Sequence, residues 1–280
     1  MAGIIPVAGL ETDFDQQLPE VMMPVDVGFT AIQKSVYECA MAGCETIWVV
    51  CHKETQPLVR STLGEWIVDP ASLKRGHFPS DNVRRIPIYY VPIHPKDRQK
   101  RDCLGWSVLY GALTAFWISR KMSKWITPDM YYAAFPYGVY PVGFLREHRK
   151  QISSRKKFSL LHQGQGIKSG LPLGFTFNGE DFKSCRKEVR DASTHLFNSD
   201  GDRLSIKERY SARHFSLDKV FNSVNIEHAN SVEVPWFYDV SSWTGYTDFI
   251  SSGESLTRPK GMKYNEWNEI DWLGEEKPAE

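Results

Sequence analysis

The sequence predicts an α/β domain with a mixed, mostly parallel sheet flanked by helices. Strand-sized apolar runs alternate along the chain with segments that carry apolar residues at helical spacing. The chain has 280 residues, of which 41% are hydrophobic and 13% aromatic, so it can bury a substantial core. No apolar run reaches the length of about 18 residues that a membrane-spanning helix needs, so we expect no membrane span.

The N-terminal segment predicts a strand, a helix and a second strand. Residues 4–9 (IIPVAG) are a short apolar run that ends in Gly9. Residues 29–43 carry apolar side chains at helical spacing, and residues 46–51 (TIWVVC) form a second apolar run. Because a crossover helix joins the two strands, we expect them to be parallel.

The middle of the chain continues the alternation. Residues 86–93 predict a third strand, and Pro87 and Pro92 restrict it to an edge of the sheet or to its own ends. Residues 107–122 predict a helix with a cationic C-terminal end, which suits the helix dipole. Residues 130–140 predict another buried strand, which opens into a turn.

The remaining segments complete one domain and a tail. Residues 174–192 predict a strand followed by a helix that is capped around Asn178. The domain ends with an expected helix, strand and helix, at residues 216–227, 231–240 and 244–252. We therefore expect one domain over residues 1–255 and an acidic, Trp-containing C-terminal tail over residues 256–280. A ligand crevice is expected beyond the carboxyl ends of the strands, near Gly9.

The composition excludes several classes of protein. Lys and Arg number 34 and Asp and Glu number 34, so a globally basic nucleic-acid coat and an acidic disordered protein are both excluded. The five cysteines are odd in number and form no CxxC pair, which predicts free buried thiols and neither a disulfide framework nor a zinc site. The N-terminus lacks a charged leader followed by an apolar stretch, so we expect a cytoplasmic protein.

Residues 4–25 (IIPVAGLETDFDQQLPEVMMPV) resemble the signature of the sugar-phosphate nucleotidylyltransferases. The resemblance continues through residues 29–50, the glycine segment at Gly105 and the passage over residues 216–252, so it covers roughly residues 3–255. It implies a single Rossmann-like nucleotidyltransferase domain. It also implies vestigial nucleotide-binding positions, which are Ala8, Gly9, Leu10, Glu11, Gly105 and Ser107.

Active members of that family use a sugar phosphate to attack the α-phosphate of a nucleoside triphosphate, with release of pyrophosphate. This chemistry needs cations around the phosphates and carboxylates that hold Mg²⁺. The sequence departs from the family at these positions. Glu11 replaces a loop glycine, Asp13 an arginine and Glu20 a lysine, so the local formal charge changes from +2 to −3. Charges about 4 Å apart interact by roughly 4 kcal/mol at an effective dielectric constant near 20, so this loop should repel a triphosphate.

One of the two metal-binding positions of the family is kept in this sequence. Pro136 and Tyr137 stand where the family has its first metal-binding aspartate, whereas Asp239 matches the second. A lone carboxylate beside an aromatic strand is more often a helix cap or a structural hydrogen-bond acceptor than a metal ligand. An acidic cluster is formed by Glu11, Asp13, Asp15 and Glu20. Such a cluster can bind a metal ion, but a solvated loop is the commoner outcome.

The departures favour a catalytically degenerate protein that acts as a binding, scaffolding or assembly component. The alternative is an active, divergent nucleotidyltransferase that uses Mg²⁺. Its phosphate clamp would come from one of two basic segments. One is a polar loop that contains Lys96, Arg98, Lys100 and Arg101. The other is residues 146–157, which we expect to be a solvated loop. Nucleic-acid binding through the same loops is a second alternative, which no motif supports.

The tail predicts a contact with a protein. Trp267, Ile270 and Trp272 stand among acidic residues, a pattern that can dock on a partner or on a second copy of the chain. The equally weighted alternative is that these Trp side chains fold back on their own domain, because both solutions bury them.

Overall fold

The computed structural model describes residues 1–9, 19–70, 84–194, 197, 201–205, 208, 211–226 and 230–256. Several predicted positions therefore lie outside the described residues: Leu10, Glu11, Asp13, Asp15, Trp267, Ile270 and Trp272.

The described fold is a mixed α/β structure built on an eight-stranded sheet with the order β11-β9-β10-β7-β1-β4-β6-β5. The strands are β1 (Ala2–Pro6), β4 (Thr46–Cys51), β5 (Trp66–Val68), β6 (Arg85–Pro92), β7 (Met130–Ala133), β9 (Phe158–Leu161), β10 (Phe175–Asn178) and β11 (Asn230–Glu233). β1 runs parallel to β4 and β7, β4 parallel to β6, and β9 parallel to β11. β10 is antiparallel to both of its neighbours and β5 is antiparallel to β6. The predicted mixed, mostly parallel sheet is confirmed.

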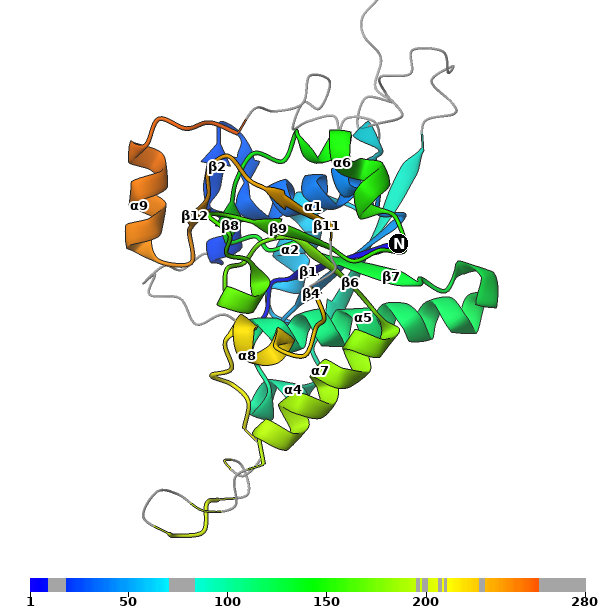
Figure 1. Cartoon of the computed structure of the whole chain (residues 1–280), viewed down its shortest axis with the longest axis vertical. Helices are drawn as coiled ribbons and strands as arrows, with labels where there is room; N and C mark the ends of the chain where they lie inside the picture. The colour runs from blue at the N-terminus through cyan, green and yellow to red at the C-terminus, as the bar shows by residue number, and fades with distance from the viewer. Residues whose placement is uncertain are drawn as a thin grey trace, which may run out of the picture.

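Helices cover both faces of this sheet. The described α-helices are α1 (Ala31–Ala42), α2 (Gln56–Leu63), α4 (Pro95–Lys100), α5 (Leu104–Met122), α6 (Leu145–Ile152), α7 (Gly179–Ala192), α8 (Leu217–Phe221) and α9 (Trp243–Ser251). In Figure 1, α1 and α6 lie above the sheet, whereas α5, α7 and α8 lie below it. Short elements complete the chain: η1 (Glu20–Met22), η3 (Lys124–Ile126), η4 (Ile167–Ser169), and the strand pairs β2 (Pro24–Asp26) with β3 (Phe29–Thr30) and β8 (Gly138–Val139) with β12 (Tyr238–Asp239).

Local signals explain the helix boundaries. The Thr30 side chain and Gln33 form a capping box at the start of α1, which ends at Gly43 in the left-handed conformation. Asn178 caps α7 through the backbone N–H groups of Glu180 and Asp181, as predicted. All five cysteines are buried free thiols, which confirms the interpretation of their spacing.

Two sequence predictions are corrected, and a third, for residues 86–93, is narrowed to one of its alternatives. Residues 146–157 are not a solvated loop, because residues 145–152 form α6, whose two ends, Leu145 and Ile152, are buried. The helix predicted over 216–227 is only the five-residue α8. The strand β6 is not at the edge of the sheet, because β5 runs beside it, and the other predicted placement holds for Pro92, which is the last residue of β6; Pro87 lies outside the register with β4.

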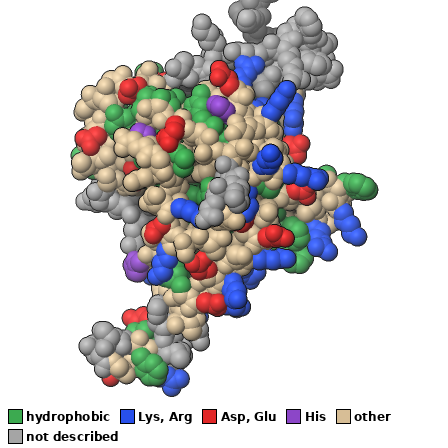
Figure 2. Space-filling view, viewed as in Figure 1, with side chains coloured by type: hydrophobic (Ala, Val, Ile, Leu, Met, Phe, Trp, Pro, Cys, Tyr) green, Lys and Arg blue, Asp and Glu red, His purple; other side chains and the backbone are tan. Residues whose placement is uncertain are grey.

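The neutral overall charge is unevenly distributed. Figure 2 shows Lys and Arg side chains gathered along the right side of the view, over α7 and the end of α5. Within the described part of the chain, no helix combines the length and the hydropathy needed to cross a bilayer.

Candidate functional site

A crevice with a cavity volume of about 380 Å³ lies beyond the carboxyl ends of β1 and β7. This is the edge where open α/β sheets bind ligands. Its wall is formed by the turn after β1, the start of α5, the segment before α8 and the β8–β12 strand pair. The lining residues are Gly9, Cys103, Leu104, Tyr137, Gly170, Pro172, Arg213, His214, Phe215, Ser216, Leu217, Asp239 and Ser241. The structure thus brings Gly9 and Asp239, which are far apart in the sequence, to one crevice.

The turn after β1 is fixed to the start of α5. Gly9 has a φ angle of +88°, and a Cβ atom there would lie 2.5 Å from the backbone of Cys103. The buried hydroxyl of Ser107 donates a hydrogen bond of 2.8 Å to the carbonyl oxygen of Ala8. Gly9 is therefore required by a close backbone contact, and Ser107 uses its proton to hold the turn.

Gly105, one of the predicted nucleotide-binding positions, is covered by a side chain of α8. A Cβ atom on Gly105 would lie 2.7 Å from the Val220 side chain of α8. The space beside this glycine is therefore filled by a buried valine, and neither residue lines the crevice cavity.

Tyr137 forms part of the crevice wall at the position predicted for the first metal aspartate. Its side chain is 3% exposed. Burial raises the pKa of the Tyr137 phenol far above its ordinary value, and the negative charge of the nearby Glu20 raises this pKa further. Tyr137 is therefore a neutral hydroxyl at physiological pH.

A buried ion pair holds the loop that carries Tyr137. The ammonium group of Lys34 lies 2.9 Å from a carboxylate oxygen of Glu38, and both side chains are fully buried in α1. Lys34 also donates to the carbonyl oxygens of Phe135, at 3.1 Å, and Gly138, at 2.5 Å.

The tyrosines Tyr132 and Tyr140 donate to the other carboxylate oxygen of Glu38. Desolvation by burial, followed by the negative charge of Glu38, raises the pKa of both phenols. Glu38 and Lys34 therefore connect α1 to the two sides of the loop that bears Tyr137.

Asp239 is exposed on β12 and also lines the crevice. Its Oδ1 atom accepts a hydrogen bond of 3.0 Å from the backbone N–H of Ser241. It is the single carboxylate among the crevice residues that the structure describes. Nor do the described ranges contain any group of three or more His, Cys, Asp or Glu side chains placed to hold a metal ion. Tyr137 lies at the position predicted for the first aspartate of the family pair, so the described crevice residues supply one carboxylate, Asp239, and not the two of the predicted Mg²⁺ site.

Sequence reasoning missed the basic residues that do line the crevice, Arg213 and His214. Both side chains are exposed. The backbone N–H of their neighbour Ala212 donates to the carbonyl oxygen of Lys100 at 2.7 Å, which fixes this segment beside α4. The only sequence signal was their place just before a predicted helix.

The predicted phosphate-clamp residues lie elsewhere. Lys96, Arg98, Lys100 and Arg101 belong to α4 or follow it, and none of them lines the crevice cavity as described. Arg98 forms an ion pair of 2.6 Å with Glu54, and Arg101 lies 3.6 Å from Asp97.

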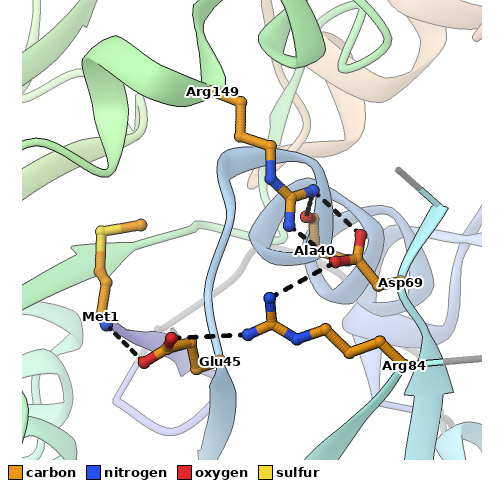
Figure 3. A network of polar contacts seen from close by, with 6 residues as sticks. All are labelled: Met1, Ala40, Glu45, Asp69, Arg84 and Arg149. Atoms are coloured by element: carbon orange, nitrogen blue, oxygen red, sulfur yellow. Dashed lines mark hydrogen bonds and ion pairs between the residues drawn. The ribbon is translucent and has the colours of Figure 1, made fainter. Parts of the chain in front are cut away.

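Arg149 of α6 lies at the opposite end of the sheet. Arg149 donates to both carboxylate oxygens of the buried Asp69, at 3.0 and 2.7 Å, and to the carbonyl oxygen of Ala40. Figure 3 shows how Arg84 links Asp69 to Glu45, which also contacts the N-terminal amine. Because Met1 and Glu45 precede the parallel strands β1 and β4, this network lies at their amino ends, away from the crevice.

The fold and the crevice define this chain as an α/β protein with the nucleotidyltransferase fold. No protein-family model matches the sequence, and no curated protein is similar to it in sequence. Solved structures of sugar nucleotidylyltransferases match it in fold.

One such structure is a protein from Bacillus anthracis assigned as a glucose-1-phosphate thymidylyltransferase, with 11% identity, a TM-score of 0.54, and coverage of 94% of this chain and 98% of that one. A UDP-glucose pyrophosphorylase complexed with UDP-glucose has 12% identity, a TM-score of 0.54 and coverage of 90% and 97%. A UDP-glucose pyrophosphorylase from Acinetobacter baumannii has 14% identity, a TM-score of 0.51 and coverage of 98% and 99%. At these identities the likeness establishes the fold.

Proposed function

We propose that this chain is a nucleotidyltransferase-fold binding protein that holds a small phosphorylated ligand in its crevice and does not transfer a nucleotidyl group. Tyr137 is the observation that carries the proposal. The neutral phenol supplies no anionic oxygen at the position where the family has a metal-binding aspartate, and the Lys34–Glu38 pair holds its loop in place. In this role the chain acts as a binding, scaffolding or assembly component, and we expect it in the cytoplasm.

The ligand class follows from the crevice wall. Arg213 offers a guanidinium group, which suits a phosphate, and His214 adds a second nitrogen donor. The cavity volume of about 380 Å³ falls in the range of small-molecule sites. One fold neighbour is a UDP-glucose pyrophosphorylase complexed with UDP-glucose, so nucleoside diphosphate sugars, sugar phosphates and nucleotides are the first ligands to test.

A protein partner, or self-association through Trp267 and Trp272, is a further part of this proposal. Both residues lie outside the described part of the chain, so the contact stays a prediction. Truncation after residue 255 tests it, because a tail-mediated complex would be lost on gel filtration while ligand binding in the crevice would remain.

The test of the crevice combines binding with turnover. Calorimetric titration of the full chain with a panel of nucleotides, sugar phosphates and nucleotide sugars should show binding of at least one class. The variant Arg213→Gln should weaken this binding about tenfold or more. The matched control Lys121→Gln removes an exposed cation near the opposite end of α5 and should leave binding unchanged. Release of pyrophosphate from a nucleoside triphosphate, a sugar phosphate and Mg²⁺ at a catalytic rate would overturn the proposal.

An active nucleotidyltransferase is the alternative. It requires Mg²⁺ and a phosphate clamp by Lys96, Arg98, Lys100 and Arg101 or by residues 146–157, and none of these residues lines the described crevice. Nucleic-acid binding through these two basic segments is the second alternative. Arg98 is paired with Glu54, and Arg149 is paired with Asp69. Because these guanidinium groups already have carboxylate partners, they do not support nucleic-acid binding.

A further inference from the structure

A second cavity, of about 370 Å³, lies between α7 and the junction of α4 and α5. Its lining contains five cations and two aromatic residues and, among the described residues, no carboxylate. The cations are Arg101, Lys183, Arg186, Lys187 and Arg190, and the aromatics are Trp106 and Phe182. It shares only the start of α5 with the crevice: Cys103 and Leu104 line the crevice, whereas Arg101 and Trp106 line this cavity.

The four cations of α7 occupy one face of the helix. Positions 183, 186, 187 and 190 follow the i, i+3, i+4, i+7 spacing that places side chains side by side. The opposing face is held in the protein by the buried residues Cys185 and Val189. Like charges four residues apart destabilise a helix, so this stripe has an electrostatic cost that an anion would remove.

The acids of α7 neutralise only part of this stripe. Asp181 pairs with Lys157 at 2.7 Å, and Glu188 accepts a hydrogen bond from Asn222. Asp191 lies 3.3 Å from Arg190. Lys183, Arg186 and Lys187 are exposed and form no ion pair with a described residue. Three of the five cations are therefore without a neutralising carboxylate in the described structure.

Two buried donors lie in the same wall. The Arg101 guanidinium lies 4.7 Å from the ring centre of Trp106, and Trp106 is 6% exposed. The Nε atom of Arg101 and the Nε1 atom of Trp106 are both enclosed and have no hydrogen-bond acceptor among the described residues. Since a buried N–H without an acceptor is costly, a shift of the partly exposed Arg101 side chain toward an anion would give its Nε an acceptor.

We propose that this cavity binds a small polyphosphate anion, either a nucleoside di- or triphosphate or the inorganic polyphosphate itself. The stripe from Lys183 to Arg190 extends about 10 Å along the helix axis, which suits a chain of linked phosphates. The concave site has the size of a small-molecule pocket and not the extended surface that nucleic acids bury. The phosphates lie against the α7 cations and Arg101, and Phe182 and Trp106 form the apolar wall. This site does not depend on the function proposed for the crevice.

The test titrates the full chain with tripolyphosphate and with ATP, in parallel with the double variant Arg186→Gln/Lys187→Gln. Binding of both ligands should weaken about tenfold or more in this variant, while the thermal midpoint should not fall, because the variant also removes like-charge repulsion within α7. The control Lys121→Gln/Lys150→Gln removes two exposed cations on other helices and should retain the affinity. A higher affinity for ATP than for tripolyphosphate would identify a nucleotide as the ligand. Equal affinities would show that the site recognises the phosphate chain alone.

The variant Arg213→Gln distinguishes binding in the crevice from binding at this site, because it should leave the tripolyphosphate affinity unchanged. Trp106 provides a local fluorescence signal. A change in fluorescence on ligand binding should be seen with the original chain and should be absent in Trp106→Phe. Equal weakening by the control pair, absence of binding at millimolar tripolyphosphate, or a preference for single-stranded RNA or DNA would each overturn the proposal.

Discussion

Lys34 and Glu38 form an ion pair of 2.9 Å in α1 with no exposed side-chain surface, directly beneath the loop that carries Tyr137. Removal of one partner from a buried pair leaves the other charge uncompensated. We expect Lys34→Met to lower the free energy of unfolding by about 3 kcal/mol or more, and the thermal midpoint by about 6–12 °C. The double variant Lys34→Met/Glu38→Gln should recover part of this loss, since the amide oxygen still accepts from Tyr132 and Tyr140. A double variant less stable than the single one would contradict this account.

Arg149 and Arg155 offer a matched comparison within the basic segment. Arg149 is bidentate to the buried Asp69, whereas Arg155 is 90% exposed and lies 3.5 Å from the exposed Asp129. Arg149→Gln should cost about 2–3 kcal/mol of unfolding free energy in denaturant titrations. Arg155→Gln should change it by less than about 0.5 kcal/mol. Neither variant should alter ligand affinity in the crevice; a loss in Arg149→Gln without loss of stability would place α6 in the site.

Gly105 tests whether the space beside it is packed or open. A methyl group there would lie 2.7 Å from the Val220 side chain. Gly105→Ala should therefore destabilise the fold by about 1–3 kcal/mol in denaturant titrations. In the Val220→Ala background, the same substitution should cost clearly less, because the valine methyl groups are gone. Equal costs in both backgrounds would show that Val220 does not cover this glycine.

Glu20 tests the electrostatics of the crevice. Its negative charge acts on the buried Tyr137 phenol. Glu20→Lys should strengthen binding of a nucleoside triphosphate several-fold at low salt, and Glu20→Gln should have an intermediate effect. Pyrophosphate release should stay absent in both, because Tyr137 is unchanged. Affinity that does not follow the charge order of Glu, Gln and Lys would place Glu20 away from the bound phosphates.

The buried thiols predict how stability depends on pH. Burial raises the pKa of Cys51 to about 12 and those of Cys103 and Cys185 to about 11. The unfolded thiols release protons near pH 8.5, which the folded thiols retain. Stability should therefore be full below pH 8 and fall as the pH rises toward 11. Denaturant midpoints at pH 7.5 and 10 measure this loss, which Cys51→Ala should reduce.

Thiol titration provides an independent check of the same burial. At pH 8 the native chain should react slowly with a thiol reagent, and all five thiols should react after unfolding in denaturant. Rapid reaction of one native thiol would identify a cysteine that opens to solvent.

The sequence by itself determined the elements whose signals are local. The strand–helix–strand unit of β1, α1 and β4 follows from apolar periodicity, and the start of α7 follows from the Asn178 cap. Hydrogen bonds and apolar spacing within a few residues encode these features. The crevice at Gly9 could also be expected, because open parallel sheets place it at their strand ends.

Only the tertiary structure decided what surrounds these elements. It placed Val220 over Gly105, Arg213 in the crevice and the charge of Glu20 near Tyr137. It also changed the expected basic loop into α6, where Arg149 pairs with Asp69. These contacts join segments that are distant in the chain, so no short pattern contains them. Their outcome depends on which side chains the packed helices bring together and on which charges lose their water in doing so.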